Sequence, residues 1–422
     1  MRNGEIIKYY RSQKGMSQEK LSQGILTTSH LSDIESNQSE PSHNHLELLA
    51  DRLELNMNVF KDSIITDIDD KLFSCYNSTV SQNAKEARKM FNYINEEYRI
   101  GLKSMHPDTQ LLYIVVKLKF YLLILNKKVI ESLYNQMKEL PISLNPVIEY
   151  IRKKTLGIYY YRINNNLEST LALKDALAMA NELNITEEDK AELYYQIALT
   201  SEKTSAVFES IHFAEKALIL YQKLYFYRRS AECHVILGLN YHKIQQFDKA
   251  EKNYISAKKI GVELQDVYLE SMAMHNLGCI QSFIGNSEEA IFYFLESLKM
   301  KKQEDRSLYS ICTLVREYHK LNQFEFARGW AEEGLMLANK NNVEDYIIHF
   351  TVLLYQLDQN PKIENYVSSY VIPYFRNAGT KDEVVRYAEL LANYYSEAQN
   401  YKLACEYFEI CLQVQKEKMI AT

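Results

Sequence analysis

The sequence contains very little glycine and proline. Of its 422 residues, 12 are glycine and 6 are proline, about 4% together, whereas average usage is about 12%. Turns between strands depend on these two residues, so the shortage argues against β-sandwiches, α/β barrels and glycine-rich nucleotide loops. We therefore predict an almost entirely helical chain, with a length that suits two or three domains of about 150 residues each.

Features of secreted, membrane-spanning and metal-binding proteins are also missing. The six cysteines include no Cys-x-x-Cys pair, which argues against a disulfide framework and against a zinc site. The first residues lack the apolar stretch of a signal peptide. The most apolar segment, residues 111–125, is too short to span a bilayer and is interrupted by Lys117 and Lys119. We expect a soluble cytoplasmic protein with no membrane contact.

Sequence patterns of common enzymes are absent as well. No G-x-x-x-x-G-K-[ST], G-x-S-x-G or H-E-x-x-H motif occurs. His43 and His45 form an isolated pair, for which metal binding is not expected. The sequence therefore predicts neither an enzyme nor a cofactor.

Residues 4–60 carry the capping pattern of several short helices. Gly15 can close the first helix with a positive φ, and Asn37 tolerates the same conformation at the end of the third. Ser17, then Thr27 or Thr28, and then Ser42 are suited to cap the next three helices.

This pattern resembles the Xre/Cro-type helix-turn-helix. The matching positions are Arg11, Gly15, Ser17–Gln18–Glu19, Leu21–Ser22, Leu31–Ser32, Ile34–Glu35, Pro41–Ser42, Leu49–Ala50 and Leu53. The shortened spacing between Gln18 and Ile34 is similar to that of the peptide-regulated activators of the PlcR and NprR type. The resemblance implies that residues 1–62 form a domain that binds double-stranded DNA.

The DNA-facing residues follow from helix geometry. A three-residue turn would set the third helix across the second, with its N-terminal half in a major groove. The expected contacts are Thr28, Ser29, His30, Ser32 and Asp33 near base edges, with Gln18, Lys8 and Lys20 near phosphates. Residues 1–60 hold six Lys and Arg against eight Asp and Glu, so one copy should bind weakly. We therefore expect two copies on a palindromic operator.

From about residue 106 onwards the sequence repeats. Gly238 occupies the small-residue position of a tetratricopeptide repeat, and Ala250, Tyr254 and Ala257 follow it at 12, 16 and 19 residues. Positions equivalent to this marker are Leu118, Gly157, Ala198, Gly278, Val315, Leu354 and Ala392. Their mean spacing is about 39 residues, longer than the usual 34. The sequence predicts an all-α chain, in which a helical linker at 63–105 precedes a right-handed repeat superhelix at 106–422.

Long repeats behind such a domain resemble the Rap–Rgg–NprR–PlcR–PrgX superfamily, and the chain is similar in size to the NprR-type members. The resemblance implies a secreted and re-imported signalling oligopeptide as the ligand. It further implies a homodimer or higher homo-oligomer whose assembly and DNA binding change when the peptide binds. From the likeness to Rap proteins, a phosphorelay response regulator is a further partner.

Candidate peptide-binding residues come from the groove-facing positions of the first helix in each pair. These positions lie at −6, −3, −2, +1 and +4 or +5 from the marker. The polar residues there are Lys154, Arg162, His275, Asn276, Arg316 and Asn393, followed by Asn240 and Lys119. An Asn amide can pair with an extended peptide backbone, and Arg162 or Arg316 can hold a carboxylate at two points. Asn276 is the first expectation. The alternative for each is a hydrated side chain without a ligand.

Two other functions remain open. Asp33 stands where relatives carry a basic residue, and residues 1–60 have an acidic excess. Both favour a module that sequesters a response regulator through its repeats, with DNA binding secondary or lost. A scaffold that binds no small ligand is the third hypothesis.

Overall fold

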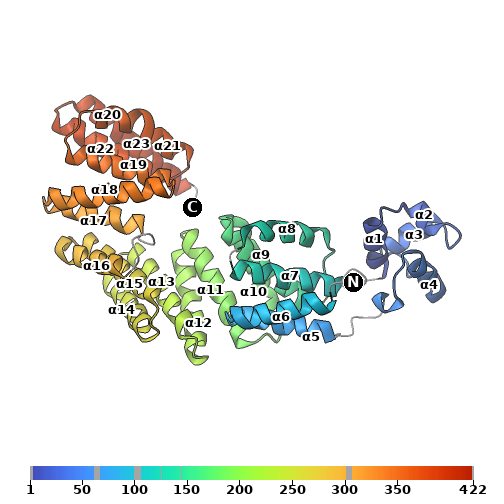
Figure 1. Ribbon diagram of the computed structural model, residues 1–422. Helices are drawn as coiled ribbons and strands as arrows, with labels where there is room; N and C mark the ends of the chain where they lie inside the picture. Colours follow the sequence, from blue (N-terminus) through green and yellow to red (C-terminus); the bar gives the residue numbers. More distant parts are fainter. Residues whose placement is uncertain are drawn as a thin grey trace. The chain divides into compact units, whose positions relative to one another are not determined.

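The computed structural model describes residues 3–60, 67–98, 106–124, 126–143, 145–300 and 307–420. These residues form helices and turns with no strand among them (Figure 1), which confirms the predicted all-α class. None of the helices described has the length and apolar character needed to cross a membrane. The chain divides into two compact units, an N-terminal unit (Met1–Gln245) and a C-terminal unit (Gln246–Thr422), and each is described by itself.

The N-terminal unit begins with the helix-turn-helix. Its elements are α1 (Asn3–Gln13), α2 (Gln18–Ser22), α3 (Thr28–Glu35), α4 (His43–Arg52) and a 3-10 turn (Met57–Phe60). The predicted caps are confirmed, because the side chains of Ser17, Thr27 and Ser42 each accept a backbone N–H three residues on. Gly15 and Asn37 have φ angles of 62° and 59°. The apolar faces meet in a core that includes Ile6, Leu21, Leu31, Ile34 and Leu49.

The connection between α2 and α3 is longer than the predicted three-residue turn. Helix α2 ends at Ser22, so residues 23–27 separate it from α3. Gly24 has a φ of 74°, a conformation that glycine adopts without steric cost. Arg52 of α4 donates to the carbonyl oxygens of Leu21 and Gln23. These bonds satisfy acceptors that the early helix end leaves free.

The remaining helices form the repeats. In the N-terminal unit they are α5 (Asp67–Val80), α6 (Ala84–Tyr98), α7 (Pro107–Leu123), α8 (Lys127–Glu139), α9 (Pro146–Arg162), α10 (Asn166–Glu182), α11 (Glu187–Lys203), α12 (Val207–Lys223) and α13 (Tyr227–Lys243). In the C-terminal unit they are α14 (Phe247–Glu263), α15 (Val267–Phe283), α16 (Ser287–Lys299), α17 (Leu308–Lys320), α18 (Phe324–Lys340), α19 (Glu344–Leu357), α20 (Lys362–Tyr366), a π-helical turn (Val367–Val371), α21 (Ile372–Asn377), α22 (Lys381–Glu397) and α23 (Tyr401–Ile420).

The repeat markers fall on the first helix of each pair. These helices are α7, α9, α11 and α13 in the N-terminal unit, and α15, α17, α19 and α22 in the C-terminal unit. Two glycines show why the marker is small. A Cβ atom on Gly157 would lie 2.5 Å from Leu173 Cγ, and one on Gly278 would lie 2.7 Å from Phe294 Cε1. Each contact is with the residue 16 positions later, so the predicted helix pairing is confirmed at these two sites.

Most repeat helices end without glycine. Residues with positive φ that close them include Asn164, Ser205, Gln265, Asn322 and Asn342. A left-handed conformation costs a non-glycine residue about 1–2 kcal/mol, and the short polar side chain of Asn lowers that cost. The chain therefore makes helical hairpins despite its shortage of glycine.

The predicted register is wrong in the seventh pair. Counting 12, 16 and 19 residues from the marker Leu354 predicts Tyr366, Tyr370 and Pro373 as its packing positions. However, Tyr370 is 41% exposed and Pro373 is also exposed. Val367 and Val371 are buried instead. The π-helical turn explains the difference, because its wider i→i+5 bonding changes which side chains face the neighbouring helices.

Candidate functional sites

Helix α3 carries the predicted base-contacting residues. Thr28, Ser29 and Ser32 are exposed, while His30 and Asp33 are half-buried. The His30 ring packs edge-on against His45 of α4, with ring centroids 5.9 Å apart. The five residues therefore share one short helix, whose opposite face is buried.

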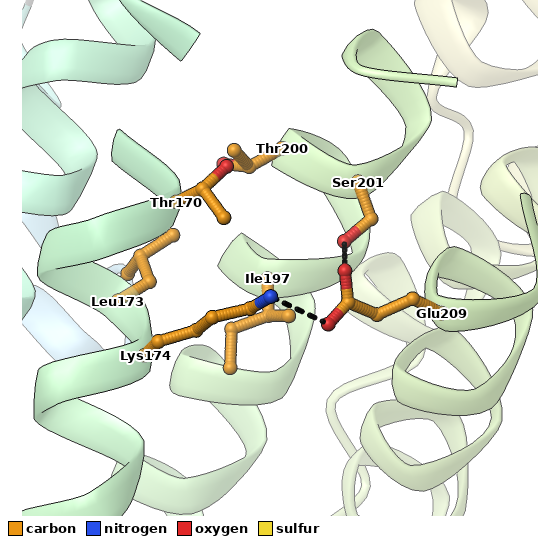
Figure 2. A pocket seen from close by; sticks show the side chains of 7 residues that line it. All are labelled: Thr170, Leu173, Lys174, Ile197, Thr200, Ser201 and Glu209. Carbon is orange, nitrogen blue, oxygen red and sulfur yellow. Dashed lines mark hydrogen bonds and ion pairs between the residues drawn. The ribbon is translucent and has the colours of Figure 1, made fainter. Parts of the chain in front are cut away.

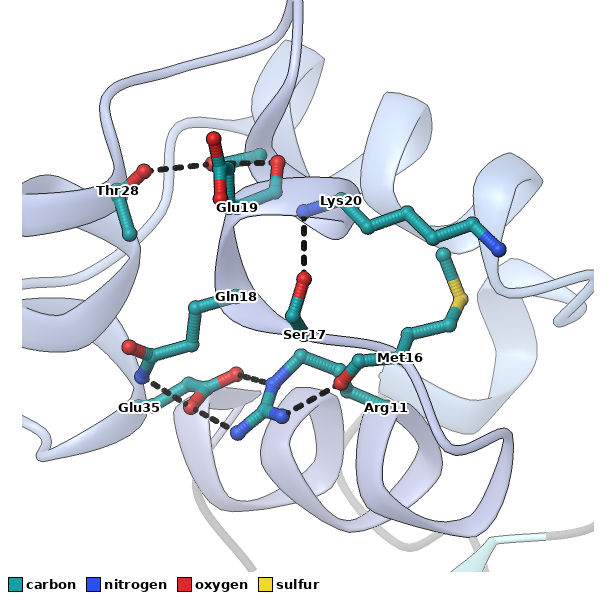
Figure 3. Close-up of polar contacts among 9 residues, drawn as sticks. Arg11, Met16, Ser17, Gln18, Glu19, Lys20, Thr28 and Glu35 are labelled. Carbon is teal, nitrogen blue, oxygen red and sulfur yellow. Dashed lines mark hydrogen bonds and ion pairs between the residues drawn. The ribbon is translucent and has the colours of Figure 1, made fainter.

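A buried carboxylate joins α1, α2 and α3 (Figure 3). Glu35 is 4% exposed and accepts from Arg11 Nε at 2.6 Å, from Arg11 Nη2 at 2.8 Å and from Gln18 Nε2 at 2.8 Å. The hydrogen bond to Glu35 raises the pKa of Arg11 despite its partial burial. Arg11 therefore has a structural role. Gln18 is fixed at the start of α2 by its hydrogen bond to Glu35, which uses one of its two amide hydrogens.

Lys8 and Lys20 supply free positive charge on this domain. Both are exposed, and neither side chain forms an ion pair with the described residues. Lys14, in contrast, lies 2.7 Å from Glu54 Oε2. The two predicted phosphate-binding lysines are thus the ones without an internal counter-ion.

In the N-terminal unit, the two lysines predicted to face the groove belong to a buried ion cluster. The cluster consists of Lys119, Lys154, Asp189 and Glu192. Lys119 donates to Glu192. Lys154 lies 2.7 Å from Glu192 Oε2 and also donates to Asp189. Tyr76 donates to the same Asp189 oxygen at 2.8 Å.

The burial of this cluster corrects the prediction for its lysines. The Lys154 side chain is fully buried and that of Lys119 is 4% exposed. Burial alone would raise the pKa of Glu192, but the two lysines outweigh it and lower that pKa to about 2. The expectation that Lys154 and Lys119 line an open groove is therefore wrong, because α11 brings two carboxylates to them.

Asn240 is also misplaced by the sequence prediction. It is fully buried, and its amide nitrogen donates to Ser210 Oγ and to Ile236 O, both at 2.8 Å. It stands two residues beyond the marker and packs against α12, so a groove role is wrong. Arg162, the last residue of α9, is exposed.

In the C-terminal unit, two of the predicted peptide-binding residues keep free polar groups. Asn276 of α15 is half-buried, and its amide nitrogen donates to Met272 O at 3.0 Å, which leaves its amide oxygen available. Asn393 of α22 is exposed. His275 is more engaged, since its ring nitrogens lie 2.9 Å from Ser310 Oγ and 3.3 Å from Cys279 Sγ. We therefore read His275 as a packing residue.

Arg316 of α17 belongs to a larger group that we call the arginine–tyrosine cluster, which consists of Tyr309, Arg316, Tyr346, His349, Arg386 and Tyr387. His349 Nδ1 lies 2.5 Å from the Tyr387 hydroxyl. Burial first, and then Arg316 and Arg386, lower the pKa of His349 to about 3, so this ring is neutral at pH 7.

Sequence reasoning identified only one member of this cluster. Arg316 stands at the +1 position of its repeat and was selected. Tyr309 and Arg386 stand at the −6 position of theirs, which the same rule marks as groove-facing, but they were not selected. The signal was therefore in the sequence, whereas the approach of α22 to α19 comes from the structure.

A shallow pocket lies elsewhere, among α10, α11 and α12 (Figure 2). It is lined by Thr170, Leu173, Lys174, Ile197, Thr200, Ser201 and Glu209. Glu209 lies 3.5 Å from Lys174 Nζ and accepts from Ser201 at 3.0 Å. Its empty volume of about 180 Å³ is below the usual 300–1,000 Å³ of ligand pockets. The charged groups here neutralise each other, so the pocket is a weak candidate for a ligand site.

Comparisons with known proteins agree with this organisation. The helix-turn-helix family model matches residues 7–60, and the tetratricopeptide-repeat model matches residues 234–303. The chain is 29% identical over 407 residues to the transcriptional activator NprA of Geobacillus stearothermophilus, which covers 94% of this chain and 99% of that protein.

Two solved structures share the fold. The apo form of the quorum sensor NprR from B. thuringiensis matches with a TM-score of 0.75 at 20% identity, over 84% of this chain and 100% of that one. NprR in complex with its cognate peptide NprX matches with a TM-score of 0.65, at the same identity and over the same shares. The chain is thus similar along nearly its whole length to NprA, has matches to a helix-turn-helix and to a tetratricopeptide repeat, and shares its fold with these two NprR structures.

Proposed function

We propose that the protein is a cytoplasmic transcriptional regulator that binds a short signalling peptide with its repeats and an operator with its helix-turn-helix. One observation carries the proposal. A single chain combines a helix-turn-helix at residues 7–60 with repeat helices that keep polar groups free, and it is similar along 94% of its length to a transcriptional activator. We propose no enzymatic role.

The DNA-binding half rests on α3 and on the two free lysines. Thr28, Ser29 and Ser32 are exposed and short enough to approach base edges, and Lys8 and Lys20 have no internal counter-ion among the described residues. The acidic excess of residues 1–60 makes the affinity of one copy low, since affinity depends on the phosphates neutralised. A homodimer on two palindromic half-sites, about 34 Å apart, overcomes that weakness.

The peptide-binding half rests on the first helices of the C-terminal unit. Asn276 and Asn393 offer amide groups that pair with an extended peptide backbone, and Arg316 offers a two-point contact for a carboxylate. Arg162 is the candidate that stays exposed in the N-terminal unit. Lys154, Lys119 and Asn240 have no place in this proposal because their polar groups are buried.

Peptide binding acts on DNA binding through assembly. A ligand shifts an equilibrium only by its difference in affinity for the two states, and coupling energies of about 1–3 kcal/mol change a second affinity about 5- to 150-fold. The peptide therefore favours one arrangement of copies, and that arrangement sets the separation of the two α3 helices.

A gel-shift experiment with genomic fragments tests the proposal. The full chain should shift a small set of fragments, and adding the peptide encoded by a short neighbouring reading frame should change their affinity at least 5-fold. Ser29→Ala with Ser32→Ala should abolish the preference for those fragments, whereas Lys20→Ala should mainly reduce the salt dependence, by about one unit of slope. If no specific fragment shifts with or without peptide, the proposal fails.

Sequestration of a response regulator is the second candidate. It is favoured by Asp33 on α3 and by the acidic excess of residues 1–60. Under this alternative, the full chain retains a purified response regulator and has no sequence-specific affinity for DNA. The two measurements together separate the candidates.

A further inference from the structure

The arginine–tyrosine cluster carries more positive charge than its own residues neutralise. Arg316 is half-buried and forms no hydrogen bond or ion pair with the residues that the structure describes. Arg386 is paired, because its Nη1 lies 2.6 Å from both oxygens of Glu383. One carboxylate therefore stands against two guanidinium charges in this group of residues, and neutral His349 adds no charge.

The two arginines converge on one stretch of first-helix surface. Helices α17 and α19 pack against each other, and the hydrogen bond between His349 and Tyr387 joins α22 to α19. Glu383 Oε2 lies 4.0 Å from His349 Nε2 and 2.6 Å from Arg386 Nη1, so Arg386 lies close to that ring. In agreement with this arrangement, the charges of Arg316 and Arg386 lower the pKa of His349.

Part of this surface is open to solvent. Tyr309 is 49% exposed and the Arg386 side chain 44% exposed. Tyr309 and Arg316 are seven residues apart on α17, and Arg386 and Asn393 are seven apart on α22, so each pair shares a helix face. The open face thus holds two cations, an aromatic ring and one amide.

We propose that the arginine–tyrosine cluster is the subsite that binds a carboxylate of the signalling peptide, with Arg316 and Arg386 as its two charged contacts. This inference rests on the proposed function and names the ligand class, a short peptide with either a free C-terminal carboxylate or an Asp or Glu side chain. Planar guanidinium groups match the two oxygens of a carboxylate. Partial burial strengthens the attraction relative to water.

Glu383 has a defined place in this subsite. Its carboxylate pairs with Arg386, and its Oε2 lies 4.0 Å from His349 Nε2. A ligand carboxylate must compete with it for Arg386, while Arg316 has no such competitor. Removing the charge of Glu383 should therefore strengthen binding of an anionic peptide, which is the opposite of the effect of removing either arginine.

Retention of a heptapeptide library on immobilised full-length protein tests the subsite. The library fixes one residue at each position in turn and is made in two series, as free acids and as C-terminal amides, with retained members quantified by mass spectrometry. Members with the correctly placed carboxylate should be retained at least about tenfold better than their Asn, Gln or amide counterparts.

Four variants define the expected pattern. Arg316→Gln and Arg386→Gln should each lower retention of the preferred members about 10- to 100-fold, the range for a charge-assisted hydrogen bond worth about 1.5–3 kcal/mol. Glu383→Gln should raise it several-fold. Arg328→Gln is the matched control, because Arg328 is also 44% exposed but lies on the second helix α18 and pairs with Asp358. It should leave retention unchanged.

The outcomes separate the subsite from the general function. A preference for free acids over amides identifies the C-terminus as the source of the carboxylate, and a preference for Asp or Glu at one position identifies a side chain. Strong retention without any preference for a carboxylate overturns the subsite and leaves the function intact, whereas no retained peptide overturns both. Circular dichroism verifies that each variant is folded. Arg316→Lys keeps the positive charge but loses the planar guanidinium that makes a two-point contact, so it should show intermediate retention.

Discussion

Several charged inward positions of the first helices are buried in the N-terminal unit, whereas two charged inward positions are open to solvent in the C-terminal unit. In the N-terminal unit, Glu192 at −6 pairs with both Lys119 at +1 and Lys154 at −3, and all three side chains are buried. In the C-terminal unit, Arg316 at +1 is half-buried without an ion pair among the described residues, and Arg386 at −6 is 44% exposed. Equivalent positions of a repeat are therefore paired and buried in one region and keep charge at or near the surface in the other.

The difference has a simple electrostatic origin. The N-terminal unit places opposite charges on neighbouring first helices. In the C-terminal unit, Arg386 pairs with Glu383 of its own helix, and Arg316 has no carboxylate partner among the described residues. A buried ion pair adds little net stability but is costly to break, whereas an exposed one is worth about 0–1 kcal/mol. The first arrangement buries its charges, and the second leaves charge at the surface where we propose that the peptide binds.

Breaking the buried ion cluster should have the largest effect on stability. Lys154→Met leaves Asp189 and Glu192 with a single buried lysine, and loss of one partner from a buried pair costs about 3–5 kcal/mol. The matched change Arg316→Gln removes a charge with no internal partner, so it should alter the unfolding free energy by less than about 0.5 kcal/mol. Urea unfolding of the full chain measures both, and equal losses would contradict the comparison.

The marker glycines should behave alike in the two units. Gly157→Ala and Gly278→Ala each introduce a Cβ atom closer than 3 Å to a packed side chain, and overpacking of this kind costs about 1–3 kcal/mol. The rigid Phe294 ring should make the second change the costlier one. Thermal unfolding tests this, and stabilisation of either variant would show that the helices are further apart than described.

The two units should respond differently to acid. The pKa of His349 is about 3, below its usual 6.5, so the unfolded chain binds more protons and stability is lost as the pH falls below about 6.5. The pKa of Glu192 is about 2, below its usual 4.5, so its contribution is lost only below about 4.5. In its pH range, each group lowers the free energy of unfolding by up to about 1.4 kcal/mol for each unit that the pH falls.

Hydrogen exchange resolves this difference helix by helix. Between pH 7 and pH 5, protection should fall in α19 and α22 and stay constant in α9 and α11. The variant His349→Gln should remove the effect. An equal loss of protection in all four helices would contradict the assignment to His349.

The smallest expected effects are at the helix ends. Ser205 and Asn322 close helices in the two units with φ angles of 60° and 57°. Glycine avoids the left-handed strain, and Asn already tolerates it better than Ser. Ser205→Gly should therefore stabilise the chain by up to about 1 kcal/mol and Asn322→Gly by a few tenths. Thermal unfolding of the two variants measures the difference, and destabilisation by Ser205→Gly would contradict it.

The sequence was sufficient for the fold class, the caps and most of the repeat register. Ser17 and Thr27 cap helices through local hydrogen bonds, and Gly157 and Gly278 follow a fixed spacing, so nearby residues determine all four. The π-helical turn at Val367–Val371 was missed, because its bonding pattern has no simple sequence signal.

The site was less predictable than the fold. The rule for groove-facing positions selected Arg316, which forms no ion pair with the described residues, but it also selected Lys154, which is buried. Whether an inward lysine is buried depends on Asp189 and Glu192, which lie more than 30 residues away. Position within a repeat therefore predicts which way a side chain points, but the residues packed around that side chain determine whether it is exposed. The predicted domain boundaries at residues 62 and 105 remain predictions, since both fall outside the described residues.

Photo-crosslinking tests most directly whether the ligand lies on the open surface of the C-terminal unit. p-Benzoylphenylalanine is placed at Tyr309 of α17 in one protein and at Tyr161 of α9 in another, and each is irradiated with the heptapeptide that the full chain retains most strongly. Our account predicts a much stronger peptide cross-link from position 309 than from position 161. A cross-link from position 161 with none from position 309 would contradict it.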